Sequence, residues 1–332
     1  MIRQAVSVLL ILACGVRPDA QDKGPSPAMR PPAEIPFSRL TAEASLPVGF
    51  EPGAVGSDAA VWVPSRASGV LIRIAAEGNV PGAPIAVGSE PCASIVVAFG
   101  SVWVPLCGDQ ALARVDATGQ KVTARPPVAV ASGDGQIATS AGSLWAITDS
   151  KGVLARIDPD TGAPVAEVYV APGATAVESG KDALWVISGG AANAPAITGR
   201  LTRVNPHSNE VIEEIALGRA PLSLAVGEGA VWTLNGDGTV TRVDPESNTI
   251  VATIPLGGDI TSGDIAAGAG SVWVSAPGVP IVRIDPRSNR ATHRFTGEGG
   301  GAVLVAHGSL WVAAGPQLTW RLDPRLVEAV RP

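Results

Sequence analysis

The chain has 332 residues, of which 46% are hydrophobic and 16% charged, and its formal net charge is -6. The mild acidity excludes the basic surface of a nucleic-acid-binding protein, and no apolar run reaches the roughly 18 residues that a transmembrane helix needs. Glycine (39) and proline (29) are abundant beside this high hydrophobic fraction, a combination that favours a turn-rich all-β fold over disorder.

Residues 1–14 are typical of an export signal. Arg3 provides a positive charge, and residues 5–13 form an apolar stretch too short to span a membrane. Residues 11–15 (Ile-Leu-Ala-Cys-Gly) resemble the lipobox of bacterial lipoproteins, where the signal is cut before a cysteine that then carries lipid. We therefore predict lipidation at Cys14, and the alternative is ordinary cleavage beyond Cys14. Both predict a protein of the periplasm or cell envelope.

Residues 15–37 follow as a proline-rich segment, with six prolines among polar residues. Such a composition favours an extended, semi-rigid chain over a packed core. We expect this segment to be a tether that holds the folded part, residues 38–332, clear of a membrane surface.

Seven tryptophans then recur in one local context. Each follows a glycine-containing turn and precedes an apolar segment with an arginine. In most repeats a turn such as Asp158-Pro-Asp-Thr-Gly162 and a last apolar segment come next. The pattern predicts four short strands in each repeat of about 41 residues. The repeated tryptophans are Trp62, Trp103, Trp145, Trp185, Trp232, Trp273 and Trp311, and successive ones are 41, 42, 40, 47, 41 and 38 residues apart.

Seven such units predict a closed ring. A four-stranded sheet has two faces to bury, and seven sheets stacked radially bury them in a β-propeller. The last repeat lacks a fourth strand, whereas residues 43–49 match residues 251–257 nearly position for position. We therefore predict an all-β, seven-bladed propeller of four-stranded antiparallel blades, in which an N-terminal strand completes the last blade and removes two open sheet edges.

Three motifs carry a resemblance to known families. Gly-Ser-Val-Trp-Val at residues 100–104, Arg-Ile-Asp-Pro at residues 156–159 and the segment 247–257 resemble the YVTN-type and virginiamycin B lyase-like propellers, and the resemblance covers residues 40–324. It implies the propeller fold, and the shared residues are blade architecture. The tryptophan precedes the Thr-Gly turn, unlike that of quinoprotein dehydrogenase propellers, and the Gly-His and Trp-Asp pairs of WD40 repeats are absent.

The lyase of the second family implies metal-assisted chemistry with a histidine at the channel face. The three histidines of this chain do not fit: we expect His207 and His307 in turns on the opposite face and His293 in an outer strand. A serine elbow, an HExxH zinc pair and a glycine-rich phosphate loop are absent as well. We therefore assign no catalytic residue.

Cys92 and Cys107 flank a predicted hairpin whose turn lies at residues 99–101. The midpoint between the two cysteines falls within this turn, so they are expected to face each other on paired strands, near disulfide distance. Export makes oxidation favourable. We predict a disulfide, and the alternative is a reactive or metal-binding thiol pair.

Residues that recur once in each blade are expected to be structural, whereas residues that do not recur are candidates for a binding site. The tryptophans are expected to pack the sheets. One arginine per blade is expected to stack on an aromatic ring or bind a carbonyl at the blade junction. These arginines are Arg73, Arg114, Arg156, Arg203, Arg242, Arg283 and Arg321.

The loops between blades, and those between second and third strands, are expected on the face that usually carries function in propellers. A long insertion at residues 188–199 lies there, either a lid or a neutral length variant. Ser94, Gln136, Ser223 and Asp264 are expected to ring the channel mouth. The candidate ligand-binding residues on this face are Arg66, Asp109, Asp134, Asp149, Arg219, Asn235 and Asp264.

These features favour an exported, membrane-tethered monomer that binds a small molecule or an envelope protein at its channel face, without catalysis or a cofactor. One alternative is a streptogramin lyase-like or hydrolase-like enzyme that uses Asp and Glu with Mg²⁺ or Ca²⁺ at the channel mouth, since hard cations prefer oxygen ligands. Another is a purely structural envelope component. A nucleic-acid partner is not expected.

Overall fold

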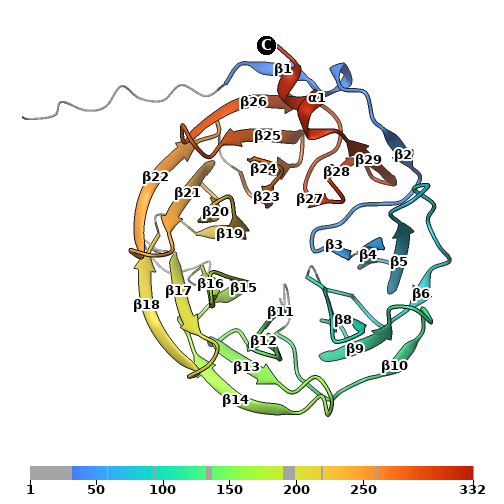
Figure 1. Cartoon of the computed structure of the whole chain (residues 1–332), viewed down its shortest axis with the longest axis vertical. Coiled ribbons are helices and arrows are strands. Elements are labelled where there is room, and N and C mark those ends of the chain that lie inside the picture. The colour runs from blue at the N-terminus through green and yellow to red at the C-terminus, as the bar shows by residue number, and fades with distance from the viewer. Residues whose placement is uncertain are drawn as a thin grey trace, which may run out of the picture.

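The computed structural model describes residues 32–57, 59–92, 94–131, 137–189, 199–217, 220–258 and 260–331. The described residues form seven sheets that stand as blades around a central channel (Figure 1). This confirms the predicted seven-bladed β-propeller. The predicted export signal, Cys14 and most of the predicted tether lie outside the described residues. Among the described residues, no helix is long and apolar enough to cross a membrane.

The blades are numbered here in the order of their tryptophans, and their strands are given from the channel outward. Blades 1 to 3 comprise β3 (Val55–Ser57), β4 (Ala60–Ser65), β5 (Val70–Ala75) and β6 (Ile85–Ala86); β7 (Val96–Ala98), β8 (Ser101–Leu106), β9 (Ala111–Asp116) and β10 (Val122–Ala124); and β11 (Ile137–Ser140), β12 (Ser143–Asp149), β13 (Val153–Ile157) and β14 (Pro164–Tyr169). Blades 4 and 5 comprise β15 (Ala174–Gly180), β16 (Ala183–Ser188), β17 (Arg200–Asn205) and β18 (Glu210–Ala216); and β19 (Pro221–Gly227), β20 (Ala230–Asn235), β21 (Thr239–Asp244) and β22 (Thr249–Pro255).

Blades 6 and 7 carry the terminal segments of the described chain. Blade 6 comprises β23 (Asp264–Gly268), β24 (Ser271–Ala276), β25 (Val279–Asp285), β26 (Arg290–Thr296) and an additional outer strand, β1 (Glu34–Pro36). Blade 7 comprises β27 (Val303–Ala306), β28 (Ser309–Gly315), β29 (Leu318–Leu322) and β2 (Ala44–Leu46), and a short helix, α1 (Pro324–Ala329), follows it.

The second strand of each blade holds the repeated tryptophan in the core. All seven indoles are at most 1% exposed. In six blades the indole N–H donates to the carbonyl of the residue five positions earlier, on the innermost strand, as Trp145 does to Ser140 at 3.1 Å. The tryptophans therefore pack the sheets, as predicted, and also fix the innermost hairpin of these blades.

The arginine of the third strand joins neighbouring blades. In six blades its guanidinium lies 5.1 to 5.8 Å from the centroid of the blade's own tryptophan ring. Arg203 also donates to the Pro245 carbonyl of the next blade at 2.7 Å and to the Asn248 side chain at 2.9 Å. Both predicted roles, stacking on an aromatic ring and binding a carbonyl at the blade junction, are confirmed.

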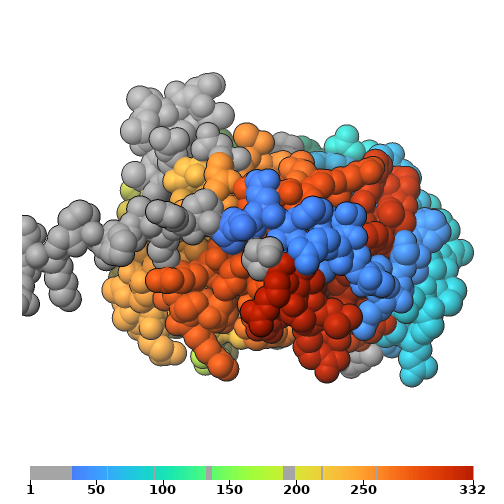
Figure 2. All heavy atoms as spheres, turned by 90° about the horizontal axis from the view of Figure 1, so that it is seen from above, coloured from blue at the N-terminus to red at the C-terminus, as the bar shows by residue number. Residues whose placement is uncertain are grey.

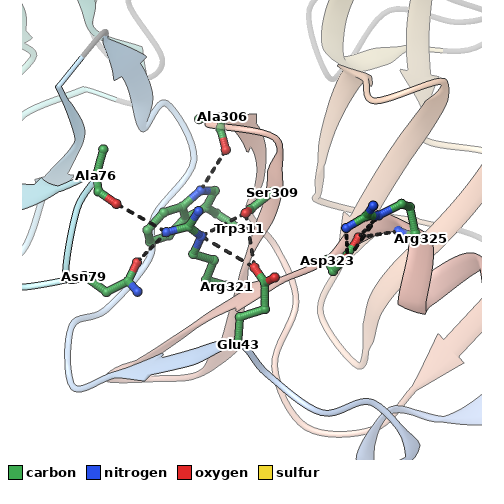
Figure 3. Close-up of polar contacts among 9 residues, drawn as sticks. All are labelled: Glu43, Ala76, Asn79, Ala306, Ser309, Trp311, Arg321, Asp323 and Arg325. Atoms are coloured by element: carbon green, nitrogen blue, oxygen red, sulfur yellow. Dashed lines mark hydrogen bonds and ion pairs between the residues drawn. The ribbon is translucent and has the colours of Figure 1, made fainter.

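The ring closes through the N-terminal strand. β2 pairs antiparallel with β29, so that Ser45 lies opposite Trp320, and this confirms the predicted completion of the seventh blade. Arg321 of β29 donates to Ser309 at 2.8 Å and lies 3.6 Å from the Glu43 carboxylate (Figure 3). Residues from both ends of the chain therefore share one polar cluster.

Two terminal elements extend the predicted ring. β1 pairs in parallel with β26, so residues 34–36 belong to the folded part, and the predicted boundary of the tether at residue 37 is too late. α1 begins after Asp323, whose carboxylate accepts a hydrogen bond from the Arg325 N–H at 2.8 Å. Figure 2 shows the N-terminal segment in blue against the C-terminal segment in red. Buried Val327 of α1 and Ile35 of β1 belong to one hydrophobic cluster.

The repeated arginine of blade 6, Arg283, has its partner in α1. The neighbouring blade 7 has no hairpin between its third and fourth strands, because its fourth strand comes from the N-terminus. Arg283 instead pairs with Glu328 of α1 at 2.9 Å and donates to Thr292 at 3.0 Å. α1 therefore supplies the partner that a hairpin turn supplies to arginines of other blades.

The predicted disulfide between Cys92 and Cys107 is present, with a distance of 5.6 Å between the two Cα atoms. The Cys92 N–H donates to the Pro105 carbonyl at 2.8 Å, and the Cys107 N–H donates to the Glu90 carbonyl at 2.9 Å. The bridge therefore fastens the loop entering blade 2 to the end of β8. Disulfides are typical of proteins outside the cytoplasm.

Candidate binding site in the central channel

A cavity of about 540 Å³ occupies the central channel. Its wall comes from β3, β15, β19, β23 and β27, together with the residues that precede β7. Most of the described side chains in this wall are small or aliphatic, and the polar ones among them are hydroxyls and two carboxylates, Glu178 and Asp264. The accessible surface of the wall is divided about evenly between polar and apolar atoms, because backbone groups, hydroxyls and the two carboxylates contribute beside the aliphatic side chains.

One ring of side chains shows how the wall departs from the repeat. The residue seven positions before each repeated tryptophan lies opposite it on the innermost strand. Six of these residues are apolar, and Glu178 is the one charged member. Five of the seven, Glu178 among them, line the cavity. The ring comprises Val55, Val96, Ala138, Glu178, Ala225, Ala266 and Leu304.

Glu178 lies on β15, where its side chain is open to the channel but enclosed by the surrounding blades. Glu178 is exposed to the channel by its accessible surface, yet the surrounding blades remove part of the water around its carboxyl and raise its pKa to about 7. Repulsion from the Asp264 carboxylate adds to the increase, while the Ser179 N–H opposes it. Within the described part of the chain, no lysine or arginine forms an ion pair with Glu178. A negative charge on Glu178 is therefore poorly compensated by these residues.

Asp264 is the first residue of β23 and connects three blades. Its carboxylate accepts hydrogen bonds from the Ser223 hydroxyl at 3.0 Å, its neighbour Ile265 N–H at 2.9 Å and the Val303 N–H at 3.2 Å. Burial raises the pKa of Asp264 to about 6, and the three hydrogen bonds limit the increase. Asp264 is therefore held rigidly, whereas the described residues give Glu178 no comparable set of partners.

The predicted mouth residues Ser94, Ser223 and Asp264 all lie in the wall of this cavity. Asp109 lies away from it, at the rim, where its carboxylate accepts the Ser89 N–H at 2.9 Å and lies 4.0 Å from Arg125. The chain therefore brings the mouth residues together and separates Asp109 from them.

The other described candidates also lie outside the cavity. Arg66 borders a shallow hollow on the rim, and its backbone N–H donates to Glu51 at 2.9 Å. The Asp149 carboxylate accepts the Lys151 N–H at 2.8 Å and so stabilises its own turn. Asn235 is only 2% exposed, and three threonines satisfy its side chain, which makes it part of the blade framework. The candidates Asp134 and Arg219, together with Gln136 and residues 190–198, lie outside the described residues.

The histidines occupy the positions that the sequence predicts, and none of them lines the cavity. His293 lies in β26 with its Nε2 atom 3.0 Å from the Val330 carbonyl, and burial lowers the pKa of this imidazole. His307 lies in the turn between β27 and β28, and His207 in the turn between β17 and β18. In the ranges that the structure describes, no three His, Cys, Asp or Glu side chains gather into a possible metal site.

Sequence analysis missed Glu178, although a signal for it exists. When the repeats are aligned on their tryptophans, the position seven residues earlier is Val, Ala or Leu in every blade except blade 4. The predicted candidates come from the loops and from the first positions of the innermost strands, whereas Glu178 lies in the middle of β15. A carboxylate at a strand position that is otherwise apolar is the departure from the repeat that identifies the site.

Comparison with known proteins establishes the fold. The chain matches no protein-family model and no curated protein. Among solved structures it is similar to a streptogramin B lyase, at 16% identity over 82% of this chain and 93% of that chain with a TM-score of 0.65. It is also similar to virginiamycin B lyase from Staphylococcus aureus, at 16% identity over 84% of this chain and 97% of that chain with a TM-score of 0.66.

A third similar structure is a hydrazine synthase from Kuenenia stuttgartiensis, at 12% identity over 88% of this chain and 99% of that chain with a TM-score of 0.68. Streptogramin lyases and a hydrazine synthase are different enzymes, so the shared architecture does not determine an activity. The chain is thus a seven-bladed β-propeller whose fold is similar to that of the virginiamycin B lyases.

Proposed function

We propose that this protein binds a small molecule in its central channel, as an exported and lipid-tethered propeller without catalytic activity. The cavity of about 540 Å³ carries the proposal. Its volume falls in the range of roughly 300 to 1,000 Å³ that small-molecule sites occupy. Its wall combines aliphatic side chains with hydroxyls, backbone groups and two carboxylates. A protein partner would contact the rim, where Asp109 and Asp149 are already engaged in local contacts.

Filling the cavity tests this proposal. Ala266→Phe and Val55→Phe each enlarge a side chain that lines the cavity, in blade 6 and in blade 1, and Ala163→Phe is the matched control in an exposed turn. We expect members of a mixture of small amines, alcohols, carboxylates and sugars to bind the wild type and the control in saturation-transfer NMR. Binding should disappear in at least one filled variant that keeps the wild-type circular dichroism. Equal binding to the filled variants would contradict the proposal.

Two features support export. Residues 1–14 are typical of a signal with a lipobox, and the Cys92–Cys107 bridge is typical of an oxidising compartment. Metabolic labelling with a fatty acid should mark the wild-type protein in a bacterial host. Cys14→Ser should lose the label, and an unlabelled wild type would contradict lipidation.

Glu178 also favours a second candidate, a carboxylate-dependent lyase or hydrolase. A carboxyl group with a pKa of about 7 exchanges protons near neutral pH, as a general acid or base does. The Mg²⁺ and Ca²⁺ content of the purified protein is the discriminating measurement. A stoichiometric metal ion that Asp264→Ala removes would favour the enzyme, and a metal-free, folded protein would favour simple binding.

A further inference from the structure

We infer that the channel cavity selects an organic monocation with N–H donors, a primary or secondary amine on an apolar body. The inference rests on the proposed function, because it names the class of ligand that the channel takes. Its basis is the position of Glu178 in a ring that is otherwise apolar, within a cavity large enough for such a molecule.

The charge of the wall favours a cation. Glu178 and Asp264 both line the cavity and repel each other. The described residues offer Glu178 no basic partner, so a bound cation would remove the repulsion and compensate its charge. An anionic ligand would increase the same repulsion.

The oxygen atoms of the wall favour a monocation over a divalent metal ion. Ca²⁺ takes about six to eight oxygen ligands, and Mg²⁺ requires near-octahedral coordination. Asp264 already accepts hydrogen bonds from Ser223, Ile265 and Val303. Glu178 lies among the aliphatic residues of the ring, such as Leu304 and Ala225. These aliphatic side chains add no oxygen ligands for a metal ion, and they can contact the carbon chain of an amine.

The side-chain types in the wall further favour N–H donors over a quaternary ammonium group. Quaternary ammonium ions are recognised by aromatic cages, and no aromatic side chain lies among the described residues that line the cavity. A carboxylate binds an amine through short, charge-assisted hydrogen bonds, which need an N–H. Thr175 also lines the cavity, and its hydroxyl oxygen is buried without a hydrogen-bond partner among the described residues.

Three probes with the same six-carbon body test the inference: hexylamine, hexanol and hexyltrimethylammonium. Calorimetric titration of the wild-type protein at pH 8, above the pKa values of both carboxyls, gives their relative affinities. We expect hexylamine to bind at least about tenfold more tightly than either other probe, because a hydrogen bond between charged groups is worth roughly a factor of ten or more. Similar affinities for the three probes would overturn the inference.

Two variants locate the effect at Glu178. Glu178→Gln keeps the shape of the side chain, and Glu178→Ala restores the alanine of blades 3, 5 and 6, so neither is expected to prevent folding. Both should weaken hexylamine binding about tenfold and leave hexanol binding unchanged. Glu210→Gln, on the exposed outer strand β18, is the matched charge control and should change nothing. Loss of hexylamine binding in the control alone, or in all three variants equally, would place the amine elsewhere.

These outcomes separate the inference from the proposed function. If hexanol binds, and Ala266→Phe abolishes its binding, while hexylamine binds no better, the channel is a ligand site without amine selectivity. The inference then fails and the proposed function stands. If none of the three probes binds the wild type, the inference fails, and the wider compound mixture alone decides the proposed function.

Discussion

Arg321 in the last blade donates a hydrogen bond to the side-chain oxygen of Asn79 in the first blade at 2.8 Å, and so joins the two ends of the ring (Figure 3). The same guanidinium lies 5.5 Å from the centroid of the Trp311 ring. It is also within 3.6 Å of the Glu43 carboxylate, on the segment that leads into β2. One side chain therefore connects the third strand of blade 7, the N-terminal segment that completes this blade, and blade 1.

Arg321→Ala should consequently destabilise the protein by about 2 kcal/mol, because it removes hydrogen bonds to a charged group and leaves their acceptors without a donor. Arg325→Ala is the matched control. The Arg325 side chain is 89% exposed and pairs with Asp323 at 2.7 Å on the surface, so its removal should lower stability far less than the removal of Arg321 does. Urea unfolding of both variants checks the prediction. Equal losses would mean that Arg321 does not contribute to ring closure.

The blades could be predicted from sequence because each repeat carries the same local signals. A tryptophan after an apolar residue and an arginine on the following strand recur in every repeat, an Asp-Pro or Asn-Pro pair follows the arginine in five of the seven, and residues 43–49 match an outer strand of another blade. The Cys92–Cys107 bridge follows from strand pairing in the same way. These features depend on contacts within one hairpin or on repetition, and both are visible in a sequence.

β1 and α1 could not be predicted, because tertiary contacts stabilise them. β1 has three residues and ends in proline, and α1 has six residues, too few for a helix that is stable alone. Their stability comes from the cluster that includes Ile35, Phe37 and Val327, which exists only once the ring is closed. Asn235 illustrates the same limit: its sequence context does not show that three threonines satisfy its amide.

Removing the disulfide should lower stability by about 3 kcal/mol, as the chain-entropy model gives for a loop of 15 residues. The double variant Cys92→Ala with Cys107→Ala keeps small apolar side chains at these buried positions. Its urea midpoint should match that of the wild type in dithiothreitol. A wild type that is equally stable with and without the reductant would show that the bridge adds nothing.

The packing of α1 gives a further prediction. Val327 is fully buried in the cluster with Ile35 and Phe37, so Val327→Ala should cost about 2 kcal/mol. Leu326 is its neighbour on the same helix and is 54% exposed. Leu326→Ala should therefore change the free energy of unfolding by about 0.5 kcal/mol or less. A larger loss at Leu326 than at Val327 would mean that α1 packs through its other face.

Glu178 makes the stability of the protein depend on pH with a definite sign. Its pKa is about 7 in the folded protein and 4.5 as an ordinary glutamate, so between these values the native state holds more protons than the unfolded state. Stability then falls as pH rises through this window and levels off above the folded pKa. Glu178→Gln lacks this titration, so its free energy of unfolding relative to that of the wild type should increase between pH 5 and pH 8.

The gain should be about 1 kcal/mol, well below the full value of the pKa shift, because the side chain is open to the channel and solvent screens its charge. Thermal unfolding of wild type and Glu178→Gln at pH 5 and pH 8 measures it, and Glu210→Gln should follow the wild type at both values. Asp264 titrates in all three proteins, so its pH-dependent contribution to stability largely cancels when they are compared. If the advantage of Glu178→Gln is the same at both pH values, or larger at pH 5, then Glu178 is solvated like a surface carboxylate. Its charge would then be available to a ligand without the desolvation that the ring imposes.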